Sequence, residues 1–224
     1  RIPCEHTAMN LVIIGRFPAD TEARIRAFFP PVWRVVFAGP DLAGPGLRDA
    51  EALIPEHLPI NAALLDRAPK MRMIQTGAGY DNVDLAECTR RGILVCSAAG
   101  VNAAAVAEHT MALILGWYKS IVYLDTFLKA HRHSRELRYS GGIIGLGAIG
   151  QRVSALCRAF GMNVLGHSRH PKSIQGVENV GLEALLARSD VVSLHVPATP
   201  ETRHMIGRQA FQRMKPSAIL VNTA

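Results

Sequence analysis

Residues 141–150, Gly-Gly-Ile-Ile-Gly-Leu-Gly-Ala-Ile-Gly, decide the fold of this 224-residue chain. Within them Gly145, Gly147 and Gly150 stand at the spacing G-x-G-x-x-G, and two isoleucines precede the first of them. In a strand–turn–helix unit the first such glycine makes the tight turn and the second lets a pyrophosphate approach the backbone. The third lets the helix pack closely on the strand. The stretch therefore predicts a dinucleotide-binding turn; a glycine-rich turn without a ligand is the alternative.

The residues after this turn complete a strand–helix–strand unit. Residues 151–160 place Val153 and Cys157 on one face at helical spacing, and Gly161 follows as a helix stop. Residues 163–165 then form a second apolar run, which predicts a strand. This context favours dinucleotide binding, because the unit has the order and length that the motif requires.

The first hundred residues show the same rhythm of short apolar runs and helical stretches. A helix is expected over residues 19–29, with Asp20 as its N-cap and two prolines as its stop. Strands are expected at residues 10–15, 35–37, 63–65, 73–75 and 92–96. Alternation of this kind predicts an α/β fold with a parallel sheet and helices on both faces.

A long helix is expected from Asn102, and its apolar character over much of its circumference predicts that it is buried, plausibly between two domains. The domain boundary is placed just before it, which divides the chain into residues 1–100 and 101–224. Glu108 and His109 fall within this helix. Adjacent helical residues point apart, which favours structural polar groups over a catalytic dyad. Further helices are expected at 182–188 and 206–214, and strands at 191–196 and 218–222.

A second glycine pair stands at the end of the strand expected at 73–75. Gly77 and Gly79 flank Ala78, and Asp84 is expected to begin a helix. Small residues here leave backbone amides free to face an anion at the carboxyl end of a strand, where open α/β sheets bind ligands. A tight strand-to-helix turn explains the same residues, and the spacing alone does not separate the two.

Composition and charge exclude several classes of protein. No stretch approaches the ~20 apolar residues of a membrane span, and the N-terminus lacks the apolar core of a signal peptide. The net charge of +7 is dispersed apart from a basic cluster at residues 131–138, so neither nucleic acid nor a membrane is an expected partner. Cys4, Cys88, Cys96 and Cys157 show neither metal-ligand spacing nor a C-x-x-C pair, which predicts reduced thiols, no metal and a cytoplasmic location.

Five stretches together resemble the D-isomer-specific 2-hydroxyacid dehydrogenase family, which includes glyoxylate and hydroxypyruvate reductases and phosphoglycerate dehydrogenases. They are Gly77–Asp84, Val101–His109, Gly142–Gly150, Val192–Thr202 and Ile219–Ala224, and in order and spacing they cover most of the chain. The resemblance implies two Rossmann-like domains. Residues 1–100 would form a flavodoxin-like substrate domain, incomplete without a C-terminal return, and residues 101–224 an NAD(P)-binding doubly wound sheet.

The resemblance also implies an oxidoreductase that transfers a hydride between a nicotinamide cofactor and a small 2-oxo or 2-hydroxy acid, such as glyoxylate or hydroxypyruvate. Formate or phosphonate oxidation is an alternative within the enzyme class. A non-enzymatic member of the same fold, a dinucleotide-sensing or corepressor-like protein, is the alternative outside it. A homodimer through the helix from Asn102 is expected, since that helix is too apolar to leave exposed.

Family members hold the substrate carboxylate with backbone amides that correspond here to Ala78 and Gly79. The cofactor-binding residues implied in the same way are Val106, Gly145, Gly147, Ala148, Ile149, Gly150, Ser168, Arg169, Lys172, His195, Val196, Pro197, Thr202, Asn222, Thr223 and Ala224. The family's catalytic arginine, glutamate and histidine follow the Asn-Thr-Ala motif, so no catalytic residue is expected in this chain. They are expected after Ala224, and the chain alone should bind dinucleotide weakly and show no turnover.

Cofactor preference depends on the end of the second nucleotide-binding strand. An NAD site usually has an acidic residue there, which accepts hydrogen bonds from the ribose 2′-hydroxyl. Here Ser168 stands at the family's acidic position, and no acid occurs anywhere in residues 151–177. Arg169 and Lys172 supply cations suited to a 2′-phosphate. NADP(H) is therefore the preferred cofactor, with NAD(H) possible in an enzyme that tolerates both.

Overall fold

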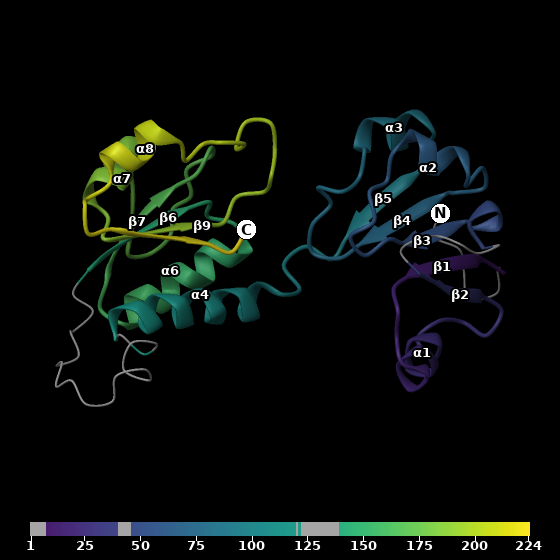
Figure 1. The fold of residues 1–224 in the computed structure, drawn as a ribbon. Coiled ribbons are helices and arrows are strands. Elements are labelled where there is room, and N and C mark those ends of the chain that lie inside the picture. Colours follow the sequence, from purple (N-terminus) through teal and green to yellow (C-terminus); the bar gives the residue numbers. More distant parts are fainter. Residues whose placement is uncertain (1–7, 40–45, 120, 122–138) are drawn as a thin grey trace. The chain divides into compact units, whose positions relative to one another are not determined.

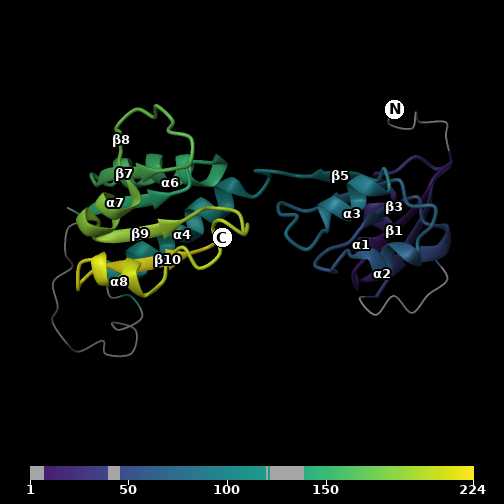
Figure 2. The same cartoon turned by 90° about the horizontal axis from the view of Figure 1, so that it is seen from above.

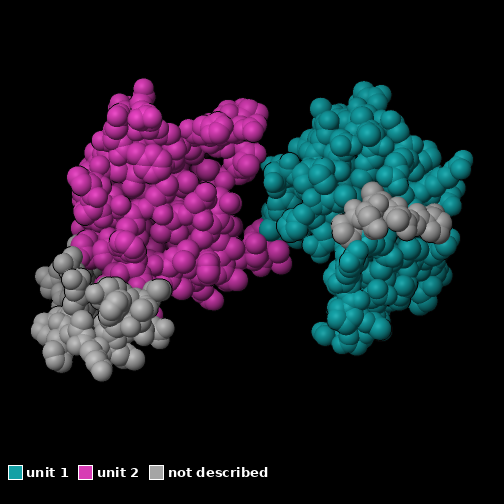
Figure 3. Space-filling model, viewed as in Figure 1, with its two compact units in different colours: residues 1–99 teal, residues 100–224 magenta. Residues whose placement is uncertain are grey.

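The computed structural model describes residues 8–39, 46–119, 121 and 139–224. The chain forms two compact units, residues 1–99 and residues 100–224 (Figure 3). Cys4 and the basic cluster at residues 131–138 lie outside the described residues.

Unit 1, residues 1–99, is built on a five-stranded parallel sheet in the order β2-β1-β3-β4-β5. The strands are β1 (Asn10–Ile14), β2 (Arg34–Ala38), β3 (Ala52–Ile54), β4 (Met73–Thr76) and β5 (Leu94–Ser97). This is the flavodoxin-like order, with the reversal between β1 and β3. The fold class inferred from the sequence is confirmed for this unit.

Helices cover both faces of this sheet because alternate strand residues point to opposite sides. Val12 and Ile14 pack with α2 (Ala62–Asp66) and α3 (Leu85–Arg90) on one face. Leu11 and Ile13 pack with α1 (Ala19–Arg26) on the other (Figure 1). A short 3-10 helix, η1 (Leu47–Asp49), adds Leu47 to the first of these clusters.

Two predictions in unit 1 are wrong. Residues 63–65 are not a strand but part of α2, which Asn61 caps by accepting a hydrogen bond from the Leu64 amide at 3.0 Å. The strand beside β1 is β3 instead, and a three-residue apolar run does not distinguish the two structures. Asp20 lies inside the first turn of α1 and is not its N-cap, which is Pro18.

Unit 2, residues 100–224, is a second five-stranded parallel sheet, in the order β10-β9-β6-β7-β8 (Figure 2). Its strands are β6 (Ser140–Ile144), β7 (Asn163–His167), β8 (Val177–Asn179), β9 (Val191–Leu194) and β10 (Ile219–Asn222). Chain order reverses between β6 and β9, the arrangement of a doubly wound nucleotide-binding sheet. Ligands of such sheets bind outside the carboxyl ends of the strands at this reversal.

Among the residues that the structure describes, four helices cover the two faces of this sheet (Figure 1). The long helix α4 (Ala103–Tyr118) and α6 (Ala148–Ala159) share one face, where Met111 Sδ lies 3.7 Å from Cys157 Sγ. Helices α7 (Leu182–Arg188) and α8 (Arg208–Arg213) cover the other. Glu108 and His109 are exposed on α4, so the burial expected for this helix does not extend to them. Burial also raises the pKa of the Cys157 thiol to about 11, which leaves that thiol protonated in the core.

Candidate functional site

The turn after β6 is fixed by its first glycine. Gly145 has φ +94°, and a Cβ built on it would lie 2.3 Å from the carbonyl oxygen of His195. Its amide donates to the His167 carbonyl at 2.8 Å. The turn is therefore wedged between the ends of β7 and β9, where glycine alone fits both the backbone conformation and the space.

The second and third glycines differ from the first in what surrounds them. A Cβ at Gly147 would meet nothing within 4 Å, whereas one at Gly150 would lie 1.9 Å from the Gly145 carbonyl oxygen. Gly147 is thus the open position and Gly150 the close-packed one, as the motif predicts. Helix α6 starts at Ala148, three residues earlier than expected, with no side-chain cap and no acidic residue in its first turn. Its N-terminus presents amides and a positive dipole end suited to an anion.

Residues after β7 are linked to the glycine turn. Lys172 Nζ donates to the carbonyl of Leu146, inside the turn, at 3.0 Å. The Asn179 side chain in turn donates to the Lys172 carbonyl at 2.8 Å, and Ser168 Oγ donates to the His170 carbonyl at 2.8 Å. Arg169 is exposed. The predicted cations therefore differ in the structure: Lys172 donates to the turn, and Arg169 is exposed. A hydrogen bond with the Thr199 side chain lowers the pKa of Glu201, and the charge of Arg169 helps to lower it.

The loop after β9 begins with a half-buried histidine, His195. His195 Nε2 lies 2.8 Å from Ser193 Oγ, and burial lowers the pKa of the imidazole to about 4. His195 Nδ1 is buried without a hydrogen-bond partner among the described residues. Farther along, Thr202 Oγ1 donates to the Pro197 carbonyl at 2.6 Å, which closes the loop on itself. His195 is neutral near pH 7, and its unpaired ring nitrogen is buried at the carboxyl end of β9.

The end of β10 meets the middle of α4 through a buried hydroxyl. Thr110, which is fully buried, donates to the Val106 carbonyl at 2.8 Å and lies 3.2 Å from Thr223 Oγ1. The Ala224 amide donates to Asn222 Oδ1 at 3.1 Å. Thr110 was not among the predicted site residues. The signal that could have found it is a hydroxyl on the apolar face of a helix, which needs a partner when buried.

The glycine pair of unit 1 forms an exposed turn after β4. The Gly77 carbonyl accepts from the Ala98 amide at 2.9 Å, and Asp84 caps α3 by accepting from the Glu87 amide at 2.9 Å. Ala78 and Gly79 are both exposed. Asp84 begins α3 as expected, and the segment 77–84 is the connection from β4. It leaves the two backbone amides accessible, so an anion-binding role remains compatible with it.

The Asn82 side chain, which was not among the predicted site residues, also holds this turn in place. Asn82 Nδ2 donates to the Leu58 carbonyl at 2.8 Å and to the Glu56 carbonyl at 3.3 Å. Glu56 has φ +51°. The loop after β3 is thereby attached to the turn after β4, and the two loops stand at the same edge of the sheet.

The described residues hold neither a metal-binding cluster nor a membrane-spanning helix. Across residues 8–39, 46–119, 121 and 139–224 no group of three or more His, Cys, Asp and Glu side chains is arranged to hold a metal ion. In that same part of the chain, no helix is both long and apolar enough to span a bilayer.

Comparison with known proteins identifies the family. The model of the D-isomer specific 2-hydroxyacid dehydrogenase NAD-binding domain matches residues 111–224. The glyoxylate reductase of Thermococcus litoralis is 39% identical over 184 residues, which cover 74% of this chain and 56% of that protein. The D-3-phosphoglycerate dehydrogenase of Mycobacterium leprae is 38% identical over 178 residues, 74% of this chain and 34% of that protein. The chain thus spans about half of the first relative and a third of the second.

A solved structure matches both units. The D-lactate dehydrogenase of Aquifex aeolicus, complexed with NAD and lactic acid, superposes with a TM-score of 0.87 at 32% identity. The match covers 96% of this chain and 69% of that one. Fold, family model and relatives agree, and the chain belongs to the D-isomer-specific 2-hydroxyacid dehydrogenase family.

Proposed function

We propose that the protein to which this chain belongs transfers a hydride between a nicotinamide cofactor and a small 2-oxo or 2-hydroxy acid, such as glyoxylate or hydroxypyruvate. The observation that carries the proposal is the glycine turn at the reversal point of the unit 2 sheet, wedged against the His195 carbonyl. The likeness to glyoxylate reductase and D-3-phosphoglycerate dehydrogenase supports the substrate class.

The residues of the turn fit a dinucleotide pyrophosphate. The space beside Gly147 is open, and the first turn of α6 carries no acid that would repel an anion. The amides of Ala148 and Ile149, with those of the glycines, would hold the pyrophosphate. When bound, the nicotinamide supplies or accepts the hydride.

The other residues proposed to bind the cofactor lie on α4 and after the carboxyl ends of β9 and β10. Val106 and residues 222–224, joined through Thr110, would line the nicotinamide side. His195, Val196, Pro197 and Thr202 would line the adenosine side, where the buried imidazole is neutral and adds no charge beside the cofactor. In unit 1 the exposed amides of Ala78 and Gly79 would hold the substrate carboxylate and so orient the carbon that exchanges the hydride.

NADP(H) is the proposed preference. Ser168 places no negative charge at the end of β7, and Arg169 is exposed beside it. Arg169 can donate to a 2′-phosphate through its planar fork, whereas Lys172 already shares its ammonium with the Leu146 carbonyl. Arg169 is therefore the residue proposed to discriminate between the two cofactors.

A homodimer through α4 and a cytoplasmic location complete the proposal. Leu113 and Trp117, one turn apart on α4, are 44% and 67% exposed, which supports an apolar contact with a second copy. Cys88, Cys96 and Cys157 are free thiols, which supports a reducing compartment.

The activity is tested on the full-length protein. Oxidation of NADPH and NADH is followed with glyoxylate, hydroxypyruvate and pyruvate as substrates, and turnover with at least one 2-oxo acid is expected. Dinucleotide binding without turnover on any of these acids would instead favour the dinucleotide-sensing alternative.

A further inference from the structure

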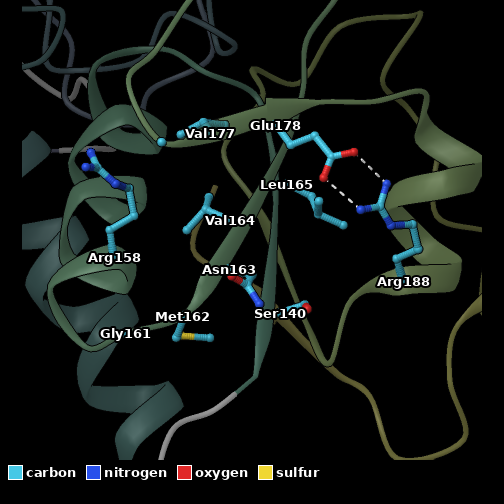
Figure 4. A pocket seen from close by; sticks show the side chains of 11 residues that line it. Ser140, Arg158, Gly161, Met162, Asn163, Val164, Leu165, Val177, Glu178 and Arg188 are labelled. Atoms are coloured by element: carbon cyan, nitrogen blue, oxygen red, sulfur yellow. Dashed lines mark hydrogen bonds and ion pairs between the residues drawn. The ribbon is translucent and has the colours of Figure 1, made fainter.

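Unit 2 contains a cavity at the edge of its sheet opposite the glycine turn (Figure 4). The cavity has a volume of about 620 Å³, and Ser140 and Asn163, the first residues of β6 and β7, line it. The dinucleotide residues follow the other ends of these strands, about 13 Å away at ~3.3 Å per residue. The cavity is therefore separate from the site described above.

On one wall of the cavity the Arg158 side chain packs against Gly176. Arg158, in the last turn of α6, lies so close to Gly176 that a Cβ there would stand 2.4 Å from Arg158 Nε. Gly176 has φ +69°, a conformation that other residues rarely adopt. In the part of the chain that the structure describes, the Arg158 guanidinium makes no hydrogen bond or ion pair. Its donors are thus available to a ligand, and the absence of a side chain at residue 176 leaves room for it.

The opposite wall carries an arginine whose charge is already balanced. Arg188 donates to both carboxylate oxygens of Glu178, at 2.8 and 2.7 Å. Figure 4 shows this pair on one side of the cavity and Arg158 on the other, with the Asn163 and Ser140 side chains between them. The two arginines and the glutamate leave one net positive charge, and it belongs to Arg158.

We propose that this cavity binds a small organic anion through an oxyanion group, either a carboxylate or a phosphate. Arg158 provides the charge and a forked pair of donors, and the Asn163 amide and Ser140 hydroxyl provide neutral hydrogen bonds. Met162 and Val164, which lie on the α6 face of the sheet as Arg158 does, line the cavity beside it. The volume falls within the range of small-molecule sites, roughly 300–1,000 Å³. This site does not depend on the proposed dehydrogenase activity.

The test is a titration of the full chain followed by amide NMR. Inorganic phosphate forms one arm and succinate the other, at an ionic strength held constant with sodium chloride. Saturable shifts are expected for the amides of Asn163 and Gly176 in at least one arm, and the arm that saturates at lower concentration identifies the oxyanion. Phosphate is also expected to shift the amides of residues 147–149, and these shifts report the dinucleotide turn independently.

Three variants make the assignment specific. Arg158→Ala should weaken binding at least tenfold while leaving the phosphate response of residues 147–149 unchanged. Arg152→Ala is the matched control, because Arg152 is an exposed residue of the same helix that does not line the cavity. Glu178→Gln removes the carboxylate that balances Arg188 and should tighten binding two- to threefold.

The proposal is overturned if the shifts of Asn163 and Gly176 do not saturate in either arm. It is also overturned if Arg152→Ala weakens binding as much as Arg158→Ala, or if Glu178→Gln weakens it. Thermal melts of the variants are recorded alongside; Arg158 is exposed, so a melting temperature close to that of the parent chain is expected.

Discussion

Thr110 Oγ1 lies 3.2 Å from Thr223 Oγ1, and the pair joins the middle of α4 to the end of β10. The Thr110 proton is already donated to the Val106 carbonyl at 2.8 Å, so the proton between the two hydroxyls comes from Thr223. This chain of bonds fixes the segment that carries Asn222 and Ala224 relative to α4. The two parts proposed to line the nicotinamide are thus held by one buried side chain.

Thr110→Val should therefore weaken both stability and cofactor binding. The substitution keeps the shape but leaves the Thr223 hydroxyl without its acceptor, at a cost of about 1–2 kcal/mol. Urea denaturation measures the effect on stability, and a cofactor titration of the full-length protein measures the effect on binding. Thr89→Val is the control, because Thr89 makes the same bond to a carbonyl four residues earlier but is exposed. Equal losses in both variants would contradict the role given to the Thr223 contact.

Gly145→Ala should abolish dinucleotide binding and cost about 3 kcal/mol or more. Positive φ alone costs roughly 1–2 kcal/mol, and the overlap with the His195 carbonyl adds a comparable amount. Gly92→Ala separates the two causes, because Gly92 has φ +70° with nothing within 4 Å of its Cβ. Thermal unfolding and cofactor fluorescence titration are the measurements. A cost for Gly145→Ala no larger than that for Gly92→Ala would show that the turn relaxes away from β9.

Folding stability should fall as the pH drops from about 6.5 towards 4. Burial lowers the pKa of His195 to about 4, so in this interval the unfolded chain binds a proton that the folded chain does not. Histidine NMR should give a titration midpoint near 4 for His195. In His195→Gln this part of the pH dependence should vanish, while His109→Gln, at an exposed position, should keep it. A His195 midpoint above 6 would refute the prediction.

Arg169→Ala and Lys172→Ala should differ in their effect on the two cofactors. Loss of Arg169 should reduce kcat/KM for NADP(H) at least tenfold with little change for NAD(H), because the 2′-phosphate alone distinguishes them. Loss of Lys172 should weaken both, because its bond to the Leu146 carbonyl supports the shared pyrophosphate turn. An unchanged ratio of the two cofactors in Arg169→Ala would make the assignment of this loop wrong.

Trp117→Glu should convert the proposed dimer of the full-length protein to a monomer. The side chain is 67% exposed on α4, and a carboxylate there would have to be buried without a partner. Phe211→Glu is the control, since Phe211 is 54% exposed on α8, across the sheet. Light scattering at micromolar concentration distinguishes the outcomes. A dimer that survives Trp117→Glu would move the interface away from α4.

The sequence correctly predicted those elements whose local residue pattern agrees with their place in the fold. The glycine turn, the long helix from Asn102 and the Asp84 cap all lie where their residues indicated. It failed at residues 62–66, because the apolar run there is as short as a strand and the decisive Asn61 cap is a single hydrogen bond. It also missed Thr110, whose partner is 113 residues away. Pairings across such separations depend on packing that no local window contains.

The bond from Lys172 to the Leu146 carbonyl has a consequence for protein engineering. Replacing the segment after β7 by one without a lysine at residue 172 would remove the ammonium that donates to the glycine turn. A transplant limited to residues 168–172 should therefore lose catalytic efficiency with every cofactor, whatever charge it brings. Residues 145–151 and 168–172 therefore depend on each other. A successful change of cofactor preference should exchange both segments together.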